Sequence, residues 1–318
     1  MLLAEVARSG VVESTHVGSV VALRPDGSVA LGLGDLVRPV FPRSANKPLQ
    51  AVGMLQAGWV PRDEQELALA SASHSGEAPH LDVVRRLLDG ADPEAVLGCP
   101  AMLPLSEPAA EALLASGGGP TRLHMNCSGK HAAMLATCTA AGWSAEGYLE
   151  AQHPLQVALQ AAIERLAGER VAHVAVDGCG APQHALTLPG LARAFSALVL
   201  AAPGTPERRT ADAVRAYPHL VGGTGRDVTL LMQAVPGSLA KDGAEGVYAA
   251  ALPDGSAVAL KIEDGSARGR MPVLVAALRS LGVRDSAALQ ALAELPVLGG
   301  GLKVGEVRAA PVLTDRSA

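Results

Sequence analysis

Two stretches of alternating residues, each interrupted by a Pro-Asp-Gly turn, constrain the fold of this 318-residue chain more than any other feature. One covers residues 16–35 (HVGSVVALRPDGSVALGLGD) and the other residues 246–265 (GVYAAALPDGSAVALKIEDG). A Pro-Asp-Gly turn between alternating runs predicts a β-hairpin. Two hairpins that lie far apart in the sequence can share one antiparallel sheet. We therefore expect an antiparallel sheet that is built from both ends of the chain.

The segment between the hairpins has the apolar spacing of helices. Helices are predicted within residues 48–58, 80–90, 107–118, 129–142 and 153–168, and two more follow the second hairpin within residues 267–282 and 286–295. The predicted fold class is α/β (mixed α+β), with flanking helices on the sheet and a mostly helical middle region. We expect one compact catalytic unit over residues 1–318, with the sheet part near 1–43 and 170–318 and the helical part near 44–169.

Composition and charge favour a compact enzyme-sized protein over other classes. Hydrophobic residues make up 49% of the chain and charged residues 18%, and the net charge is −5, so we expect neither a nucleic-acid partner nor a membrane surface. The first ten residues lack the pattern of a secretory signal peptide. The four cysteines are too scattered for a disulfide framework, which favours a reducing cytoplasmic location.

Lysine is scarce, since only five of the 26 basic residues are lysine. Arginine stays protonated, whereas a lysine that loses water contacts in a cleft can lose its proton and act as a base or a metal ligand. The positions of the lysines are therefore informative. They are Lys47, Lys130, Lys241, Lys261 and Lys303.

One of these lysines follows a serine at the predicted start of a helix. Ser44 and Lys47 form a Ser-x-x-Lys pattern, in which positions i and i+3 lie on one face of a helix and the two side chains can meet. A neutral lysine there would take the proton of the serine hydroxyl, which is a weak nucleophile without an adjacent base. Alone, the pattern is short enough to occur by chance, and Ser44 could equally cap the helix.

A second serine-rich stretch follows an apolar segment. Ser71, Ser73 and Ser75 occupy alternate positions around His74. If the preceding segment is a strand, the three serines share one face and point together. The alternative is a capping turn before the helix expected at residues 80–90.

Two cysteines lie in separate glycine-containing stretches. Cys127 stands in NCSGKH, and Cys179 follows an apolar strand-like run in the stretch VAVDGCGAP. Two thiolates on turns could hold zinc, with further ligands from Lys130, His131, His124, His184 or water, but no Cys-x-x-Cys pair is present. The alternative is that both cysteines are small buried apolar residues.

Taken together, six short motifs resemble the type II asparaginases of the Rhizobium etli kind. In chain order they are RSANKPLQA, ASHSGE, NCSGKHAAML, DGCGAP, AKDGAEGVYA and KIEDG, and the match spans nearly the whole chain. The resemblance implies two serine–lysine tandems, Ser44 with Lys47 and Ser73 with Lys241. It also implies a zinc site formed by Cys127, Lys130 and Cys179 with water, which supports the site and does not supply the nucleophile.

The resemblance further implies a fold like that of serine β-lactamases and penicillin-binding proteins, and a homodimer. The expected activity is hydrolysis of L-asparagine to L-aspartate and ammonia through an acyl-enzyme formed on a lysine-activated serine. Four residues that flank the motifs are candidates for binding the substrate's α-carboxylate and α-amino groups: Arg43, Asn126, His131 and Asp177. The alternatives are another serine acyl-transfer amidohydrolase of the β-lactamase or glutaminase type and a non-catalytic zinc-binding protein.

Overall fold

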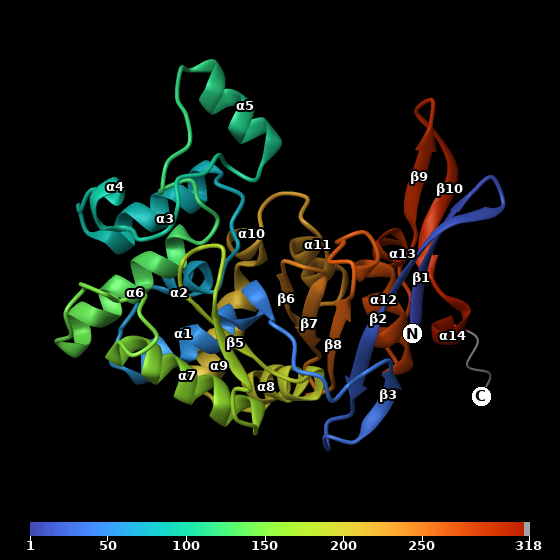
Figure 1. The fold of residues 1–318 in the computed structure, drawn as a ribbon, viewed down its shortest axis with the longest axis horizontal. Coiled ribbons are helices and arrows are strands. Elements are labelled where there is room, and N and C mark those ends of the chain that lie inside the picture. Colours follow the sequence, from blue (N-terminus) through green and yellow to red (C-terminus); the bar gives the residue numbers. More distant parts are fainter. Residues whose placement is uncertain (315–318) are drawn as a thin grey trace. The chain divides into compact units, whose positions relative to one another are not determined.

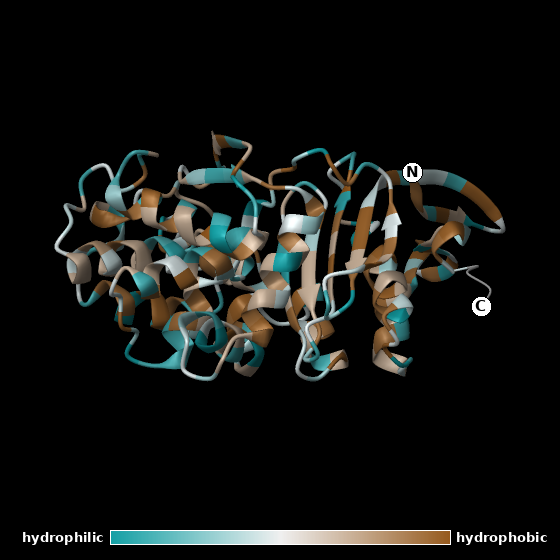
Figure 2. Ribbon diagram, turned by 90° about the horizontal axis from the view of Figure 1, so that it is seen from below, coloured by the Kyte–Doolittle hydropathy of each residue, from teal (hydrophilic) through white to brown (hydrophobic). Residues whose placement is uncertain are grey.

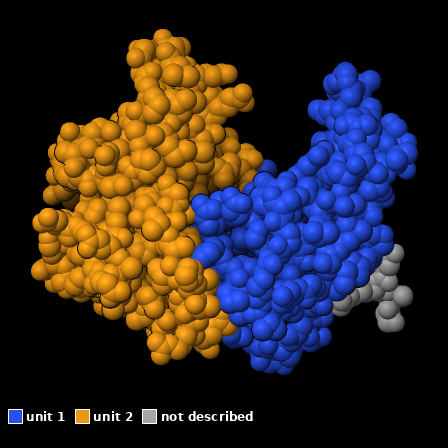
Figure 3. All heavy atoms as spheres, viewed as in Figure 1, with its two compact units in different colours: residues 1–45, 186–200, 230–318 blue, residues 46–185, 201–229 orange. Residues whose placement is uncertain are grey.

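The computed structural model describes residues 1–314, which form two compact units (Figures 1 and 3). Unit 1 comprises residues 1–45, 186–200 and the described residues from 230 onward, and unit 2 comprises residues 46–185 and 201–229. Residues 170–185 and 201–229, which the sequence analysis grouped with the sheet, belong to unit 2. Residues 170–185 contain two strands. These two strands pair with each other and with no strand of the large sheet.

An eight-stranded antiparallel sheet forms the centre of unit 1. Its strands in spatial order are β6 (Leu239–Gly243), β7 (Val247–Ala251), β8 (Ala257–Ile262), β2 (Val11–Leu23), β1 (Leu2–Arg8), β10 (Leu302–Ala309) and β9 (Leu295–Gly299), and β3 (Val29–Leu33) also pairs with β2. The two predicted hairpins are β2–β3 and β7–β8, and they lie side by side because β8 pairs with β2. The prediction of one sheet built from both chain ends is confirmed.

The two Pro-Asp-Gly turns close their hairpins in the same way. The Asp26 carboxylate accepts a hydrogen bond from the Ser28 N–H at 2.9 Å, and the Asp254 carboxylate accepts one from the Ser256 N–H at 2.9 Å. The glycine between each pair has a positive φ, +82° and +93°, which a residue without Cβ adopts readily. The sequence therefore dictates both turns locally.

Helices pack against this sheet within unit 1. They are α8 (Leu188–Leu200), α12 (Arg270–Ser280), α13 (Ala287–Ala293) and α14 (Pro311–Thr314). Helix α8 contacts β2, β7 and β8, and α12 contacts β1, β2, β8 and β10. Every residue of β6 and β7 is buried, so both faces of these strands are covered. Figure 2 shows apolar colours along much of the central strands. Short alanine side chains in β7 and β8 suit this close packing.

Unit 2 is mostly helical, as predicted for the middle of the chain. Its helices are α1 (Lys47–Gln56), α2 (Glu64–Ala70), α3 (Ala78–Leu88), α4 (Pro93–Val96), α5 (Glu107–Ala115), α6 (Ser128–Ala141), α7 (Pro154–Ala167), α9 (Pro206–Ala216) and α10 (Pro218–Val221). Strands β4 (His173–Val176) and β5 (Pro182–Ala185) form a separate hairpin. Helix α11 (Asp227–Ala234) begins in unit 2 and continues in unit 1. Within residues 1–314, no helix has both the length and the apolar character needed to cross a bilayer.

Candidate active site

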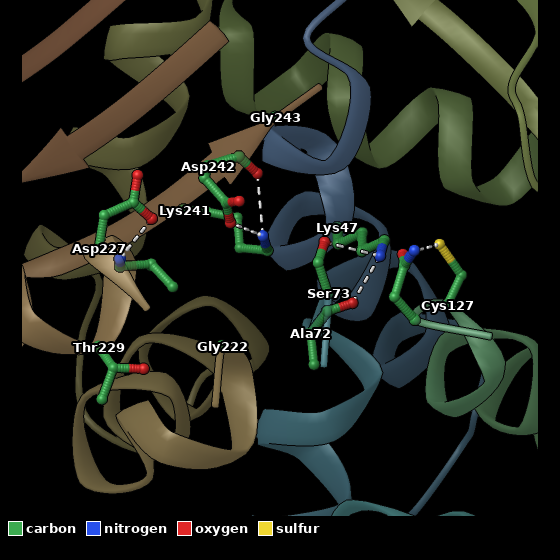
Figure 4. Close-up of polar contacts among 12 residues, drawn as sticks. Lys47, Ala72, Ser73, Cys127, Gly222, Asp227, Thr229, Lys241, Asp242 and Gly243 are labelled. Atoms are coloured by element: carbon green, nitrogen blue, oxygen red, sulfur yellow. Dashed lines mark hydrogen bonds and ion pairs between the residues drawn. The ribbon is translucent and has the colours of Figure 1, made fainter. Parts of the chain in front are cut away.

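Lys47, the first residue of α1, is buried in unit 2 beside a serine hydroxyl. Its side chain is only 1% exposed, and its Nζ donates to the Ser73 Oγ at 3.0 Å and to the Ala72 carbonyl at 2.5 Å (Figure 4). Helix α1 carries the lysine, while the serine lies in the loop after α2. A lysine amine within hydrogen-bond distance of a serine hydroxyl is placed to exchange a proton with it.

The loop of residues 71–77 sends its three serines to three different partners. The Ser71 Oγ donates to the Leu67 carbonyl, the Ser73 Oγ faces Lys47, and the Ser75 Oγ donates to the Gly222 carbonyl at 2.8 Å. The preceding segment is the helix α2, so the prediction of a strand with three serines on one face is wrong. The alternative of a capping turn is confirmed, because Glu77 and His80 form a capping box at the start of α3.

A glycine-rich loop, residues 221–225, packs against the serine loop. The Ser73 N–H donates to the Val221 carbonyl at 3.0 Å, and the Glu77 carboxylate accepts from the Thr224 N–H and hydroxyl, both at 2.9 Å. At Gly223, where φ is +131°, an added Cβ would lie 2.2 Å from the Ser75 Oγ. Glycine is therefore required at this point for the two loops to pack together.

The two motif cysteines and Lys130 form a buried cluster near the start of α6. The Lys130 Nζ lies 3.1 Å from the Cys179 Sγ, and all three side chains are at most 3% exposed. Cys127 is the residue before α6, and Cys179 lies in the turn between β4 and β5. The fold thus brings together the three residues that the resemblance assigns to a metal site.

The three side chains of this cluster shift one another's pKa values. A hydrogen bond from Cys179, together with the nearby Lys47 and Lys130 charges, holds the pKa of the Cys127 thiol well below its usual value although burial opposes this. The same hydrogen bond and burial raise the pKa of Cys179. Burial acts to lower the pKa of Lys130, but the facing Cys179 and Cys127 sulfurs outweigh it and raise that pKa. These shifts favour a thiolate at Cys127 and an ammonium group at Lys130.

His74 links the serine loop to this cluster. Its Nδ1 accepts from the Gly76 N–H at 3.2 Å, so its Nε2 carries the proton and donates to the Ser128 Oγ at 2.9 Å. Its backbone N–H also donates to the Asn126 carbonyl at 3.1 Å. Burial, and secondarily the charges of His80, Lys47 and His124, lower the pKa of His74, so the ring is neutral. The segment Asn126–Ser128 thus has two hydrogen bonds to the residue that follows Ser73.

Three predicted residues belong to unit 1. Ser44 and Arg43 lie in a short 3₁₀ helix (Arg43–Asn46), half-buried, and the Arg43 guanidinium lies 3.7 Å from the Glu245 carboxylate. Arg43 has a φ of +54°, which is uncommon for a residue other than glycine. Lys241 lies on β6 with no exposed surface, and its Nζ donates to both the carbonyl and the carboxylate of Asp242.

The remaining predicted residues, Asn126, His131 and Asp177, are in unit 2. The Asn126 Oδ1 lies 3.1 Å from the Cys127 Sγ, and Asp177 stands partly exposed in the turn between β4 and β5. His131 is fully buried on α6, with its Nδ1 2.7 Å from the Tyr148 hydroxyl, and burial lowers its pKa. All three lie on the segments that carry Cys127, Lys130 and Cys179.

Sequence reasoning missed some residues that contact the predicted ones. Asp242 carries the carboxylate that pairs with Lys241, and its place directly after that lysine was an available signal. The Tyr148 hydroxyl, which contacts His131 and accepts from the Gly98 N–H, has no such signal in the sequence. Ser128 was part of a quoted motif, but its partner His74 lies 54 positions earlier in the chain.

The chain is similar in structure to two groups of solved proteins. A β-lactamase from Mycobacterium bovis aligns with a TM-score of 0.42 and 15% identity over 78% of this chain and 88% of that one. The native form of the protein Mglu aligns with a TM-score of 0.45 and 16% identity, over 83% of this chain and 63% of that one. A comparison with curated proteins gave no match. The family model of L-asparaginase II matches residues 4–309, nearly the full length, and the chain therefore belongs to the L-asparaginase II family.

Proposed function

We propose that this protein hydrolyses the side-chain amide of L-asparagine to L-aspartate and ammonia. The family membership supports a hydrolase of this type. The single observation that carries the proposal is the buried Lys47 amine at 3.0 Å from the Ser73 hydroxyl. Acyl transfer needs such a base beside a serine, whereas a non-catalytic zinc-binding protein would have no use for this pair.

In the proposed reaction, Ser73 is the nucleophile and Lys47 its base. The unprotonated amine takes the hydroxyl proton as the Ser73 Oγ bonds to the side-chain amide carbon of asparagine. The C–N bond then breaks, and the departing nitrogen takes the proton from Lys47 and leaves as ammonia. Water attacks the resulting ester with Lys47 again as base. The bond between Ser73 Oγ and the acyl carbon breaks, the Ser73 Oγ takes the proton from Lys47, and aspartate is released.

Ser44 and Lys241 enter the proposal through the family resemblance. Both belong to unit 1, and their pairings, Ser44 with Lys47 and Ser73 with Lys241, stay predictions. Asp242 balances the charge of Lys241 in its buried position, so this ammonium group is stabilised within unit 1. We assign Ser44 and Lys241 to proton transfer in the same reaction.

Substrate recognition requires one fixed anion and one fixed cation. We assign the Asp177 carboxylate to the α-amino group of asparagine and the Arg43 guanidinium to its α-carboxylate, since a planar guanidinium suits a carboxylate. Asn126 and His131 are proposed to complete the substrate contacts. An extra methylene in a tight pocket changes binding by only about 1–3 kcal/mol, so we expect a weaker reaction with glutamine.

We also propose a zinc ion at Cys127, Lys130 and Cys179. The donors fit, because two sulfurs and one amine nitrogen are buried together and thiolate ligands suit this ion. Within residues 1–314 no group of three or more His, Cys, Asp or Glu side chains is placed to hold a metal, so the third protein ligand would be the lysine. A bound zinc ion would fix the start of α6 and take the place of the Lys130 proton, without supplying the nucleophile.

The test is ammonia release from L-asparagine by the wild type and by Ser73→Ala, Ser44→Ala and Lys241→Ala variants, with zinc quantified in each preparation. We expect an active wild type and loss of activity in each variant at unchanged zinc content. Covalent labelling with an asparagine-derived electrophile, followed by peptide mass spectrometry, identifies the acylated serine, which we expect to be Ser73. A wild type that hydrolyses only glutamine or a β-lactam would favour the alternative amidohydrolase. The expected homodimer is tested by analytical ultracentrifugation.

A further inference from the structure

Asn46 is a buried polar residue directly before Lys47, and the proposed reaction gives it no role. The residue is 1% exposed and occupies the N-cap position of α1. An asparagine at this position usually accepts a hydrogen bond from an N–H group in the first turn of its own helix, but the Asn46 side chain forms no such bond. Burial of an amide costs free energy unless the group is hydrogen-bonded, so its partners indicate what it does.

The Asn46 amide is directed at strand β5. Its Nδ2 donates to the Gln183 Oε1 at 2.9 Å and to the His184 carbonyl at 3.3 Å. The Gln183 Oε1 also accepts from the His184 N–H at 3.2 Å, which holds this acceptor in place. Gln183 is 5% exposed and His184 1%, so water competes little for these bonds. Asn46 therefore connects the start of α1 to a strand that lies 137 positions later in the chain.

Helix α1 is held within unit 2 both at its middle and at its start. At its middle the helix packs closely on α7, since a Cβ added at Gly53 would lie 3.1 Å from the Leu159 Cα. At its start the bonds of Asn46 to β5 hold the backbone from which the Lys47 side chain extends. The packing contact sets how near α1 lies to α7, and the amide bonds set where its first turn begins.

The start of α1 is important because the Lys47 amine has to meet a hydroxyl on another segment. Its Nζ lies 3.0 Å from the Ser73 Oγ, which belongs to the loop after α2 (Figure 4). A misplacement of about 1 Å in such a pair costs about 10²-fold in rate. Strand β5 also follows the turn that carries Asp177, the residue assigned to the α-amino group of the substrate. The Asn46 amide thus holds the helix that carries the base and the hairpin that carries Asp177 in one arrangement.

From these contacts we propose that Asn46 is a positioning residue, whose amide ties the start of α1 to β5 and thereby places the Lys47 amine beside the Ser73 hydroxyl. The inference rests on the proposed function, because it takes Lys47 as the base. The acting group of Asn46 is its N–H donor, since both of its partners on β5 are acceptors.

The experiment measures ammonia release from L-asparagine and the free energy of unfolding for Asn46→Asp and for a control, Thr210→Ala. Asn46→Asp keeps the shape of the side chain but replaces the donor by an oxygen that faces two acceptors. It should lower kcat by about 10- to 100-fold and leave KM within about threefold of the wild-type value, since the assigned substrate contacts lie on other residues. Thr210 is buried on α9, which also contacts α1, and its Oγ1 donates to the Pro206 carbonyl of the same helix at 2.8 Å. Thr210→Ala should lower the free energy of unfolding but not kcat.

A second variant tests the same bond from its other side. Gln183→Ala removes one acceptor and leaves the start of α1 unchanged, so it tests the bond even where Asn46→Asp does not fold. It should lower kcat less than Asn46→Asp does, because the His184 carbonyl remains as an acceptor. The double variant of Asn46→Ala and Gln183→Ala should lose about as much kcat as Asn46→Ala alone, because two changes that remove one interaction are not additive.

Three results with an active wild type would overturn this inference and leave the proposed function in place. They are a wild-type kcat in Asn46→Asp, an equal fall of kcat in Thr210→Ala at an equal loss of stability, and additive effects of Asn46→Ala and Gln183→Ala. A wild type that releases no ammonia from asparagine would overturn the proposed function and this inference together.

Discussion

Lys47 is the base in both steps of the proposed reaction. It lies buried with the Ser73 hydroxyl and the Ala72 carbonyl as hydrogen-bond acceptors. Its role as a base requires a group that can lose a proton in that position. Lysine can do so, and arginine cannot.

We therefore expect Lys47→Arg and Lys47→Met to lower the rate of ammonia release by about 10²–10⁴-fold, the usual contribution of a general base. The effect should appear in kcat and not in KM, because the substrate contacts assigned above lie on other residues. Steady-state kinetics with asparagine measure this. Retained activity in Lys47→Arg would show that the proton is taken elsewhere.

His74 is a positioning residue in this account, because it touches Ser128 and the Asn126 backbone and no reacting atom. His74→Ala removes the donor to the Ser128 Oγ and leaves a cavity in the core, which should lower the free energy of unfolding by about 1–3 kcal/mol. Ser73 then loses its fixed position, so kcat should fall as well. His74→Gln, which keeps a donor, should restore part of both losses in denaturant titrations and kinetics. Rescue of stability without kcat would separate the two roles.

At the scale of elements, hydrogen bonds hold the serine loop and the glycine-rich loop together. Residues 71–77 and 221–225 are joined through Ser73, Ser75 and Glu77. Gly223 allows the close approach. At Gly225, where φ is +70°, an added Cβ would meet no other atom within 4 Å. The pair offers a matched comparison.

Gly225→Ala should lower the free energy of unfolding by about 1–2 kcal/mol, the cost of a left-handed backbone conformation for a residue with a Cβ. Gly223→Ala should lose about 1–3 kcal/mol more, because its Cβ would overlap the Ser75 Oγ. It should also reduce kcat, whereas Gly225→Ala should not. Chemical denaturation and ammonia release measure the two effects, and equal losses in both variants would contradict the coupling of the loops.

Local sequence signals predicted most helices and strands, but they did not predict which side chains meet between distant elements. The hairpins and the helices α1, α3, α5, α6, α7, α12 and α13 follow from turn chemistry and apolar spacing. The sequence analysis did not predict α2, because its short apolar run fits a strand as well as a helix. The contact between Lys47 and Ser73 depends on how α1 packs beside α2, which no short motif encodes. The grouping of Cys127, Lys130 and Cys179 was predicted from the motif resemblance and not from apolar periodicity.

At the scale of the whole molecule, buried histidines make stability depend on pH. Burial lowers the pKa of His74, His80, His131 and His184, the last to about 4, below the usual 6.5. The unfolded chain binds these protons near pH 6.5, and the folded chain binds them only at lower pH. The contribution of these histidines to the free energy of unfolding is therefore fully present above pH 6.5. It is lost as the pH drops from 6.5 toward their pKa values in the folded chain.

For His184 this window runs from about pH 6.5 to about pH 4. Each such histidine contributes a slope of about 1.4 kcal/mol per pH unit within its window. His184→Asn should remove one slope of this size from the free energy of unfolding, measured by denaturant titration at several pH values between 4 and 7. An unchanged slope would show that another group titrates in its place.

The pairing of β1 with β10 joins Ala4 to Ala309. During synthesis on the ribosome, β1 therefore leaves the ribosome long before β10, the strand with which it pairs, has been synthesised. Most of unit 2 comes from one continuous run, residues 46–185, which can collapse while the sheet is still incomplete. Closure of the sheet requires contacts between residues far apart in sequence, and such contacts form slowly. The exposed strands of the unfinished sheet are the part of a nascent chain that a chaperone would need to protect.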